Sequence, residues 1–173
     1  ANDLTIYAYC VTQGKVQAPK SYAEAASRAE QMLAFVAKYW QNYDLRKVDK
    51  WVRGFFHPKT LKEVLAAFNY CRRKRDWFLA ACLCGILHHQ RPGFLSYPAS
   101  HMVPYLRPVL FPREDYPELY EYRPLAERIT KKIKRAYRRP NIGQGWSHRD
   151  YNIQNCDART LPFHDSSMDL ILT

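Results

Sequence analysis

The residue whose type and setting most suggest chemistry is Asp157, which follows a short segment, 152–156, with the character of a strand. A Leu-Pro-Phe loop comes next at 161–163, and then an apolar segment, 168–173, typical of a buried parallel strand. Ligands of open α/β sheets bind at the carboxyl ends of strands. A carboxylate there can accept a hydrogen bond from a nucleoside amino group. The alternative, which spacing alone favours, is that Asp157 only caps a turn.

This segment resembles the S-adenosylmethionine-dependent amino-methyltransferases that act on DNA and, more distantly, those that act on RNA. The shared pattern is Asp-Ala-Arg at 157–159, Leu-Pro-Phe at 161–163 and Asp-Leu-Ile-Leu-Thr at 169–173. The resemblance implies that Asp157 contacts the adenine amino group of S-adenosylmethionine, with Ala158 beside it. In the family, a Pro-Pro-Tyr catalytic motif follows. It is expected just after Thr173, so no catalytic residue is predicted within the chain.

The first residues resemble a second cofactor segment of the same family, in which an acid holds the ribose hydroxyls of the cofactor. Asp3 matches that acid, and Leu4 follows it. A ribose diol suits a carboxylate that accepts two hydrogen bonds. The alternative is that Asp3 caps a helix. The family's glycine-rich cofactor loop is absent, and the six glycines are few, so the chain is expected to be an incomplete, inactive portion of the enzyme.

Positive charge is the second feature that suggests a function. The chain has 27 Lys and Arg against 16 Asp and Glu, a formal net charge of +11. Such a balance points to an acidic partner, and clustered cations bind nucleic acid by displacing counterions from phosphates. A membrane surface is the weaker alternative, because no exposed Trp or Phe edge accompanies the cations. The predicted nucleic-acid contacts in these clusters are Arg72, Arg73, Arg75, Lys131, Lys132, Lys134, Arg135, Arg138 and Arg139.

A stretch rich in proline and aromatic residues, 91–120, supplies further candidates. An enzyme that modifies a base must take it out of the stack and hold it in a pocket. We therefore expect Tyr97, His101, Tyr105 and Arg107 to contact a DNA backbone or an extruded base. The alternative is a lid, stiffened by proline, that packs on the rest of the chain.

The five cysteines include no Cys-x-x-Cys pair, so reduced thiols in a cytoplasm are expected rather than disulfides. Cys84 and His88 share a helix face, with Cys82 and His89 nearby. Structural zinc normally takes four ligands from separated pairs. The pattern therefore favours buried thiols, and no metal site is predicted.

Hydrophobic spacing and capping residues predict the elements that would position these side chains. Ser21 and Glu24 form a capping box before a helix over 21–41. A second helix is expected from Pro58, a buried third over 77–89 after Asp76, and a fourth over 124–138. A short helix capped by Asn2 or Asp3 and ended by Gly14 is expected at the start.

These features together predict an α/β protein, a partial Rossmann-like methyltransferase fold with a large, mainly helical insertion. The expected divisions are 1–20 and 149–173 as parts of the cofactor domain, and 21–148 as the insertion that binds nucleic acid. The expected function is S-adenosylmethionine-dependent methylation of an exocyclic amino group of adenine or cytosine in DNA, in the cytoplasm beside the nucleoid. The alternatives are an RNA amino-methyltransferase and a non-enzymatic, basic helical module that binds nucleic acid.

Overall fold

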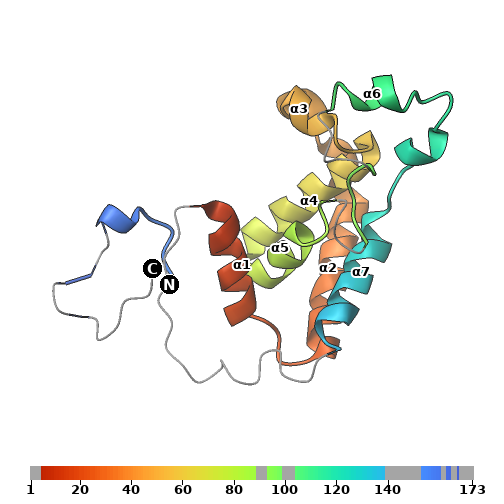
Figure 1. Cartoon of the computed structure of the whole chain (residues 1–173). Coiled ribbons are helices and arrows are strands. Elements are labelled where there is room, and N and C mark those ends of the chain that lie inside the picture. Colours follow the sequence, from red (N-terminus) through yellow and green to blue (C-terminus); the bar gives the residue numbers. More distant parts are fainter. Residues whose placement is uncertain are drawn as a thin grey trace.

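The computed structural model describes residues 5–88, 93–98, 104–138, 153–160, 163, 164 and 167. The described chain is mostly helical (Figure 1). The α-helices are α1 (Ile6–Val16), α2 (Tyr22–Tyr39), α3 (Lys50–Arg53), α4 (Pro58–Lys74), α5 (Trp77–Cys84), α6 (Arg107–Leu110) and α7 (Leu125–Ala136). Single-turn 3-10 helices are η1 (Trp40–Asn42), η2 (Leu45–Lys47), η3 (Pro117–Tyr120) and η4 (Ala158–Thr160).

The prediction of an α/β fold is wrong for this structure. The described residues form no strand and no sheet. Of the predicted strand 152–156, residues 153–156 are described, and they form no strand before the helical turn η4 begins at Ala158. Gln154 forms an isolated β-bridge, which is too short to count as a strand. The second predicted strand, 168–173, lies outside the described residues.

The long helices begin where the sequence predicts, for local reasons. Ser21 accepts a hydrogen bond from the Glu24 amide at the start of α2, and Asp76 accepts one from the Leu79 amide at the start of α5. α4 starts at Pro58 behind His57, whose side chain accepts from the Lys59 amide. The ends agree less well: α5 ends at Cys84, with Gly85 as its C-cap, and not at His89.

The expected boundaries of the first helix are wrong. Thr5, rather than Asn2 or Asp3, caps α1, and Gly14 lies inside the helix instead of ending it. Gly14 is buried against α5, where an added Cβ would come within 2.5 Å of the Ala81 Cβ. The glycine therefore serves the close approach of two helices. Because α1 packs on α5, we describe it with the helical unit, and the predicted division after residue 20 stays a prediction.

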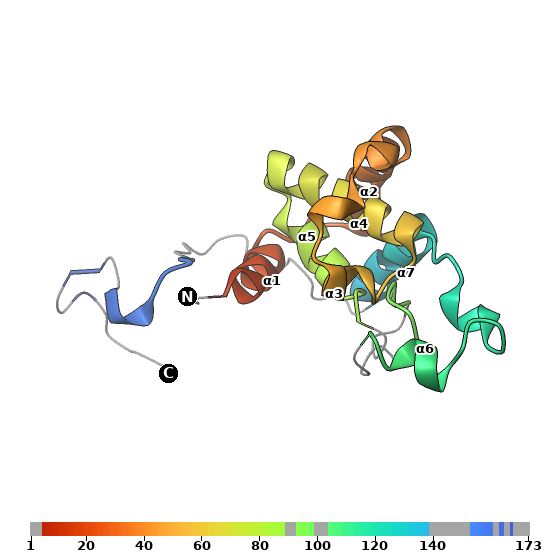
Figure 2. The ribbon, with the colours of Figure 1, turned by 90° about the horizontal axis from the view of Figure 1, so that it is seen from above.

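The core lies between α2, α4, α5 and α7 (Figures 1 and 2). α5 is apolar on nearly every side, and its Leu79 and Leu83 are fully buried, as its sequence predicts. Met32 of α2 and Ile129 and Ile133 of α7 close around them. Ile129 and Ile133 are four residues apart, so both lie on the same face of α7 and that face points into the core.

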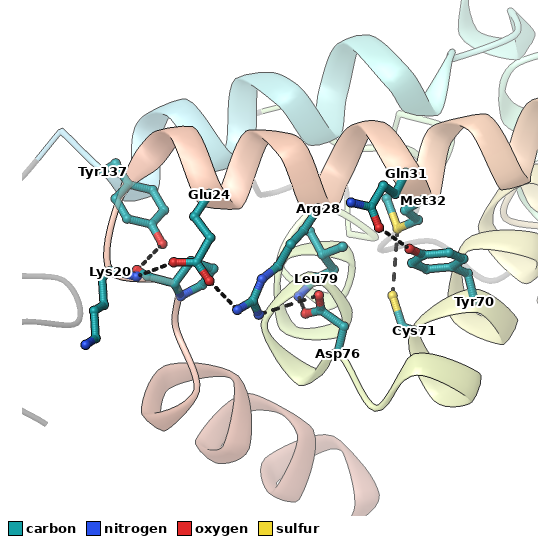
Figure 3. A network of polar contacts seen from close by, with 11 residues as sticks. Lys20, Glu24, Arg28, Gln31, Met32, Tyr70, Cys71, Asp76, Leu79 and Tyr137 are labelled. Carbon is teal, nitrogen blue, oxygen red and sulfur yellow. Dashed lines mark hydrogen bonds and ion pairs between the residues drawn. The ribbon is translucent and has the colours of Figure 1, made fainter. Parts of the chain in front are cut away.

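Polar contacts at the edge of this core connect α2 with its neighbours (Figure 3). Arg28 of α2 forms ion pairs with Glu24 on its own helix and with Asp76, 3.8 Å away, at the start of α5. The hydroxyl of Tyr137, just after α7, donates to the backbone oxygen of Pro19 at 2.6 Å. Two segments that are 118 residues apart in the sequence are thereby held together. None of the described helices has the length and apolar character that crossing a membrane would require.

Candidate nucleic-acid interface

The basic face of α7 is opposed to a fully buried apolar face. Leu125, Ile129 and Ile133 have exposed fractions of 1% or less. With 3.6 residues per turn, the cations of the helix fall on its remaining sides. We call these side chains the α7 basic face: Arg128, Lys131, Lys132, Lys134, Arg135 and Arg138. The predicted Arg139 lies outside the described residues.

The first turn of α7 is fixed by two side chains of α4. α7 follows Pro124 and has no side-chain cap of its own. Instead, the buried Glu63 carboxylate accepts hydrogen bonds from the Leu125 amide at 3.1 Å and from the Tyr122 hydroxyl at 2.5 Å. The Thr60 hydroxyl donates to the Arg123 backbone oxygen at 3.0 Å. A carboxylate beside a helix N-terminus is favourable, because the amide groups there carry partial positive charge.

The cations of the α7 basic face differ in their surroundings. Lys131 pairs with Glu127 at 2.5 Å, and the Arg128 Nε donates to the Phe94 backbone oxygen at 2.9 Å. Lys134 and Arg138 are exposed, and neither forms an ion pair within the described part of the chain. These two residues are the most available for a phosphate.

Lys132 lies against the end of α5. A Cβ added at Gly85 would come within 3.0 Å of its Nζ. Its charge acts on Cys82 of α5, where burial raises the thiol pKa to about 12 and Lys132 opposes that rise. Lys132 is half-buried. We therefore expect its ammonium to add to the positive electrostatic potential of the α7 basic face more than to contact a phosphate directly.

The second predicted cluster lies at the end of α4. Arg72, Arg73, Lys74 and Arg75 are all exposed and, within the ranges described, form no ion pairs. Arg75 ends the helix in the left-handed conformation with φ 53°, and its amide donates to Arg72 and Cys71 backbone oxygens. The last turn of α4 therefore projects positive charge at the helix end, where the helix dipole favours it.

The structure separates the four candidates of the proline-rich stretch. Tyr105 is 68% exposed, whereas Tyr97 is 5% and Arg107 is 1% exposed. The Arg107 guanidinium lies over the Phe55 and Tyr97 rings, and its Nη1 donates to the Gly54 backbone oxygen at 2.6 Å. Burial lowers the pKa of Arg107 and raises that of Tyr97.

The prediction that Tyr97 and Arg107 contact DNA therefore does not fit this structure. Their flat groups stack on each other in the interior, as guanidinium and aromatic rings do when they lose water. His101 lies outside the described residues.

Asp157 occupies a turn, not the end of a strand. Its Oδ1 accepts from the Arg159 amide at 2.9 Å, and the Arg159 Nε lies 3.0 and 3.1 Å from its two oxygens. Arg159 is the main cause that lowers the pKa of Asp157. Asp44 and Arg46 at η2 repeat the same arrangement with the same distances. An Asp-x-Arg sequence thus forms the same local turn at both places.

The predicted cofactor contacts are not assembled by the described residues. Asp3 and Leu4 lie outside them, and Ala158 contributes the first residue of η4. Both oxygens of Asp157 accept hydrogen bonds from Arg159, and the adenine contact that the resemblance implies stays a prediction.

The thiols of α5 are protonated at neutral pH. Burial raises the pKa of Cys82 to about 12 and that of Cys84 to about 11. Because thiolates are the form that binds metals and attacks electrophiles, these cysteines behave as apolar side chains. In the part of the chain that the structure describes, no three His, Cys, Asp or Glu side chains gather in a way that could hold a metal ion. His89 lies outside that part.

A groove between α2 and α4, which the sequence does not predict, encloses about 690 Å³. We call it the α2–α4 groove. Its walls are formed by Phe35, Tyr39, Asn42, Tyr43, Asn69, Tyr70, Arg73 and Lys74. Phe35 and Tyr39 lie within the helix that the sequence predicts over 21–41. The sequence shows aromatic residues on one predicted helix and an Arg-Lys run at the end of another. Only the packing of α2 against α4 places these residues around the same groove.

Comparison of the chain with protein-family models, curated proteins and solved structures finds no match.

Proposed function

We propose that this protein binds nucleic acid, and duplex DNA in particular, through the α7 basic face. The observation that carries the proposal is the amphipathicity of α7. One side is fully buried, and the opposite side carries lysine and arginine, with no acidic residue between Arg128 and Arg138. A helix of this kind presents a row of cations at the pitch of its turns. Lys134 and Arg138, both exposed, supply the direct phosphate contacts.

Binding of this kind is electrostatic and largely independent of sequence. Each phosphate that a lysine or arginine neutralises releases condensed counterions, so affinity falls steeply as salt is added. A DNA partner would place the protein in the cytoplasm, beside the nucleoid.

Replacing three cations of the α7 basic face tests the proposal. The variant Lys131→Gln, Lys134→Gln, Arg138→Gln is expected to bind duplex DNA at least about tenfold more weakly at ordinary ionic strength. Its plot of log affinity against log salt is expected to be shallower by about 0.9 for each phosphate that the variant no longer neutralises. Fluorescence anisotropy of a labelled duplex across a salt series measures both quantities.

The matched control removes three exposed cations elsewhere: Lys47→Gln, Lys50→Gln, Arg53→Gln. Both variants have the same net charge, so a difference between them reports position rather than total charge. Equal losses in the two variants, or no duplex binding by the unmodified protein, would contradict the proposal.

A second candidate function is methyl transfer from S-adenosylmethionine to an exocyclic amino group of adenine or cytosine in DNA, or in RNA. Its support is the resemblance of 157–163, of 169–173 and of the first residues with Asp3 to the amino-methyltransferase family. In the described residues Asp157 accepts hydrogen bonds from Arg159, so a contact with the adenine amino group would add to that interaction or replace it. Calorimetric titration with S-adenosylmethionine separates the two functions, since a module that only binds nucleic acid releases no heat. Competition between duplex DNA and structured RNA separates the two substrates.

A further inference from the structure

The α2–α4 groove combines three kinds of side chain that recognise nucleotides. Aromatic rings come from both helices and from Tyr43 after η1, amides come from Asn42 and Asn69, and cations come from Arg73 and Lys74. None of the residues that form its walls is acidic. The volume of about 690 Å³ lies within the range of small-molecule and cofactor sites.

The aromatic walls are held in fixed orientations. Tyr43 accepts a hydrogen bond from Asn69 Nδ2 at 2.7 Å, which ties its hydroxyl to α4. Phe35 packs against Tyr39 with ring centroids 4.7 Å apart, and against Tyr70 with centroids 5.5 Å apart. Tyr39 and Tyr43 are half-buried and both line the groove, while the exposed end of the Lys38 side chain lies over the Tyr39 ring, 5.1 Å from its centroid.

The cations at the rim have no acidic partner in the described part of the chain. Arg73 and Lys74 are exposed and form no ion pairs there. Arg72 borders an adjoining hollow of about 430 Å³, whose walls include Tyr43, Phe68 and Asn69. The nearby acid Asp76 pairs instead with Arg28 and accepts from the Leu79 amide. The rim therefore presents unneutralised positive charge beside aromatic faces.

We propose that the α2–α4 groove binds unpaired nucleotides of a nucleic-acid strand, with bases stacked on Tyr39 and Tyr43 and phosphates on Arg73 and Lys74. Base faces are covered by their neighbours in a duplex and become free only in a single strand. A groove that offers ring faces together with cations is the arrangement that binds single strands without sequence preference. The inference rests on the proposed function, because it assigns a second nucleic-acid contact to the same helical unit.

An acidic peptide is the other polyanion that the rim cations could hold. Its carboxylates would use the cations alone, whereas a nucleotide uses the rings and the cations together. The groove also lacks the extended apolar stripe that an amphipathic peptide helix would need. The observations therefore favour the nucleotide strand, and the peptide becomes an outcome of the test.

The experiment measures binding of the full chain to a labelled oligothymidylate of about 12 nucleotides and to a duplex of the same length. Tyr39→Ala is expected to weaken single-strand binding about tenfold, since loss of one stacked base is of that order. Tyr39→Phe keeps the ring and is expected to bind as the unmodified protein does. Arg73→Gln, Lys74→Gln is expected to weaken single-strand binding and to reduce its salt dependence.

Two matched controls remove the same groups outside the groove. Tyr116→Ala deletes an exposed tyrosine, and Lys47→Gln, Lys50→Gln deletes two exposed cations. Circular dichroism and the thermal midpoint show whether each variant is folded. If Tyr39→Ala unfolds the chain, the inference is tested by comparing single-strand binding of Arg73→Gln, Lys74→Gln with that of its charge control.

The outcomes separate this inference from the proposed function. Single-strand binding that is unchanged in the folded groove variants overturns the inference, while duplex binding that depends on the α7 basic face still supports the proposed function. Tighter binding of a poly-glutamate peptide than of the oligothymidylate also overturns the inference. If the groove variants lose single-strand binding, the inference is supported. If duplex binding is also unchanged when the α7 basic face is altered, the proposed function is contradicted.

Discussion

Glu63 shows how one side chain determines where a functional helix starts. The residue lies on the inner side of α4 and is 8% exposed. Its two oxygens accept from the Leu125 amide and the Tyr122 hydroxyl, so the carboxylate replaces the cap that α7 lacks. In addition to the effect of burial, the hydrogen bond to Glu63 raises the pKa of Tyr122. The position of the α7 basic face thus depends on an acid 62 residues before Leu125 in the chain.

Glu63→Ala is expected to lower the free energy of unfolding by about 1–3 kcal/mol, because it leaves a buried amide and a hydroxyl without an acceptor. Chemical denaturation followed by circular dichroism measures the change. Glu114→Ala, at an exposed position, is the control and is expected to stay within about 0.5 kcal/mol of the unmodified protein. Equal effects of the two substitutions would rule out the capping role of Glu63.

At the scale of elements, α1 is attached to the rest of the chain through α5. The attachment depends on a small residue, because Gly14 lies against the Ala81 side chain and the Trp77 backbone. Tyr9, earlier on α1, meets the Trp77 ring edge-on with centroids 5.5 Å apart. The two contacts fix both the distance and the rotation of α1 on α5.

Gly14→Ala separates helix propensity from packing. Alanine favours an isolated helix over glycine by about 1 kcal/mol, so a purely local effect would stabilise α1. An added Cβ would come within 2.5 Å of Ala81 and of the Trp77 backbone oxygen, and we expect a net loss of about 1–3 kcal/mol in docking of α1.

Faster amide hydrogen exchange across α1 and a weaker near-ultraviolet signal from tryptophan would report this loss. Gly85→Ala is the control, since its nearest atoms belong to the flexible end of the Lys132 side chain, 3.0 Å away. Slower exchange in α1 of Gly14→Ala would show that propensity outweighs packing.

At the scale of the whole molecule, buried thiols make stability depend on alkaline pH. Burial raises the pKa of Cys82 from 9.0 to about 12 and that of Cys84 to about 11. Burial is also the main cause that raises the pKa of Cys71 and that of Tyr137, the latter to about 12. The folded state holds these protons more tightly than the unfolded chain does.

The sign follows from linkage. A pKa raised by folding contributes stability that is complete below the unfolded value and is lost as the pH rises through the folded value. We expect the free energy of unfolding to be steady up to about pH 9 and to fall between about pH 9 and about pH 12. Urea denaturation at several alkaline pH values measures it. Cys82→Ala should make the fall less steep, and an identical slope in this variant would contradict the assignment.

Much of the helical structure could be predicted from the sequence, because its signals are local. Ser21 and Asp76 cap helices through amides three residues away, and the spacing of Leu125, Ile129 and Ile133 marks an inner face that is buried as predicted. The net charge and the basic character of α7 also follow from composition and periodicity. Asp157 was open to two interpretations, and the local turn is the one observed.

Tertiary structure decided the features that depend on residues distant in the sequence. The sequence predicts Arg107 to be a surface cation. In the structure it is buried and donates a hydrogen bond to the backbone oxygen of Gly54, 53 residues earlier in the chain. The α2–α4 groove exists only because Tyr39 and Arg73 come from different helices that pack together. A sheet likewise depends on pairing between distant segments, so the strand-like character of 152–156 did not by itself determine whether a strand would form. Local sequence determines which helices form and which sides are apolar or charged. The free energy of packing determines which polar side chains are buried and which meet at a surface.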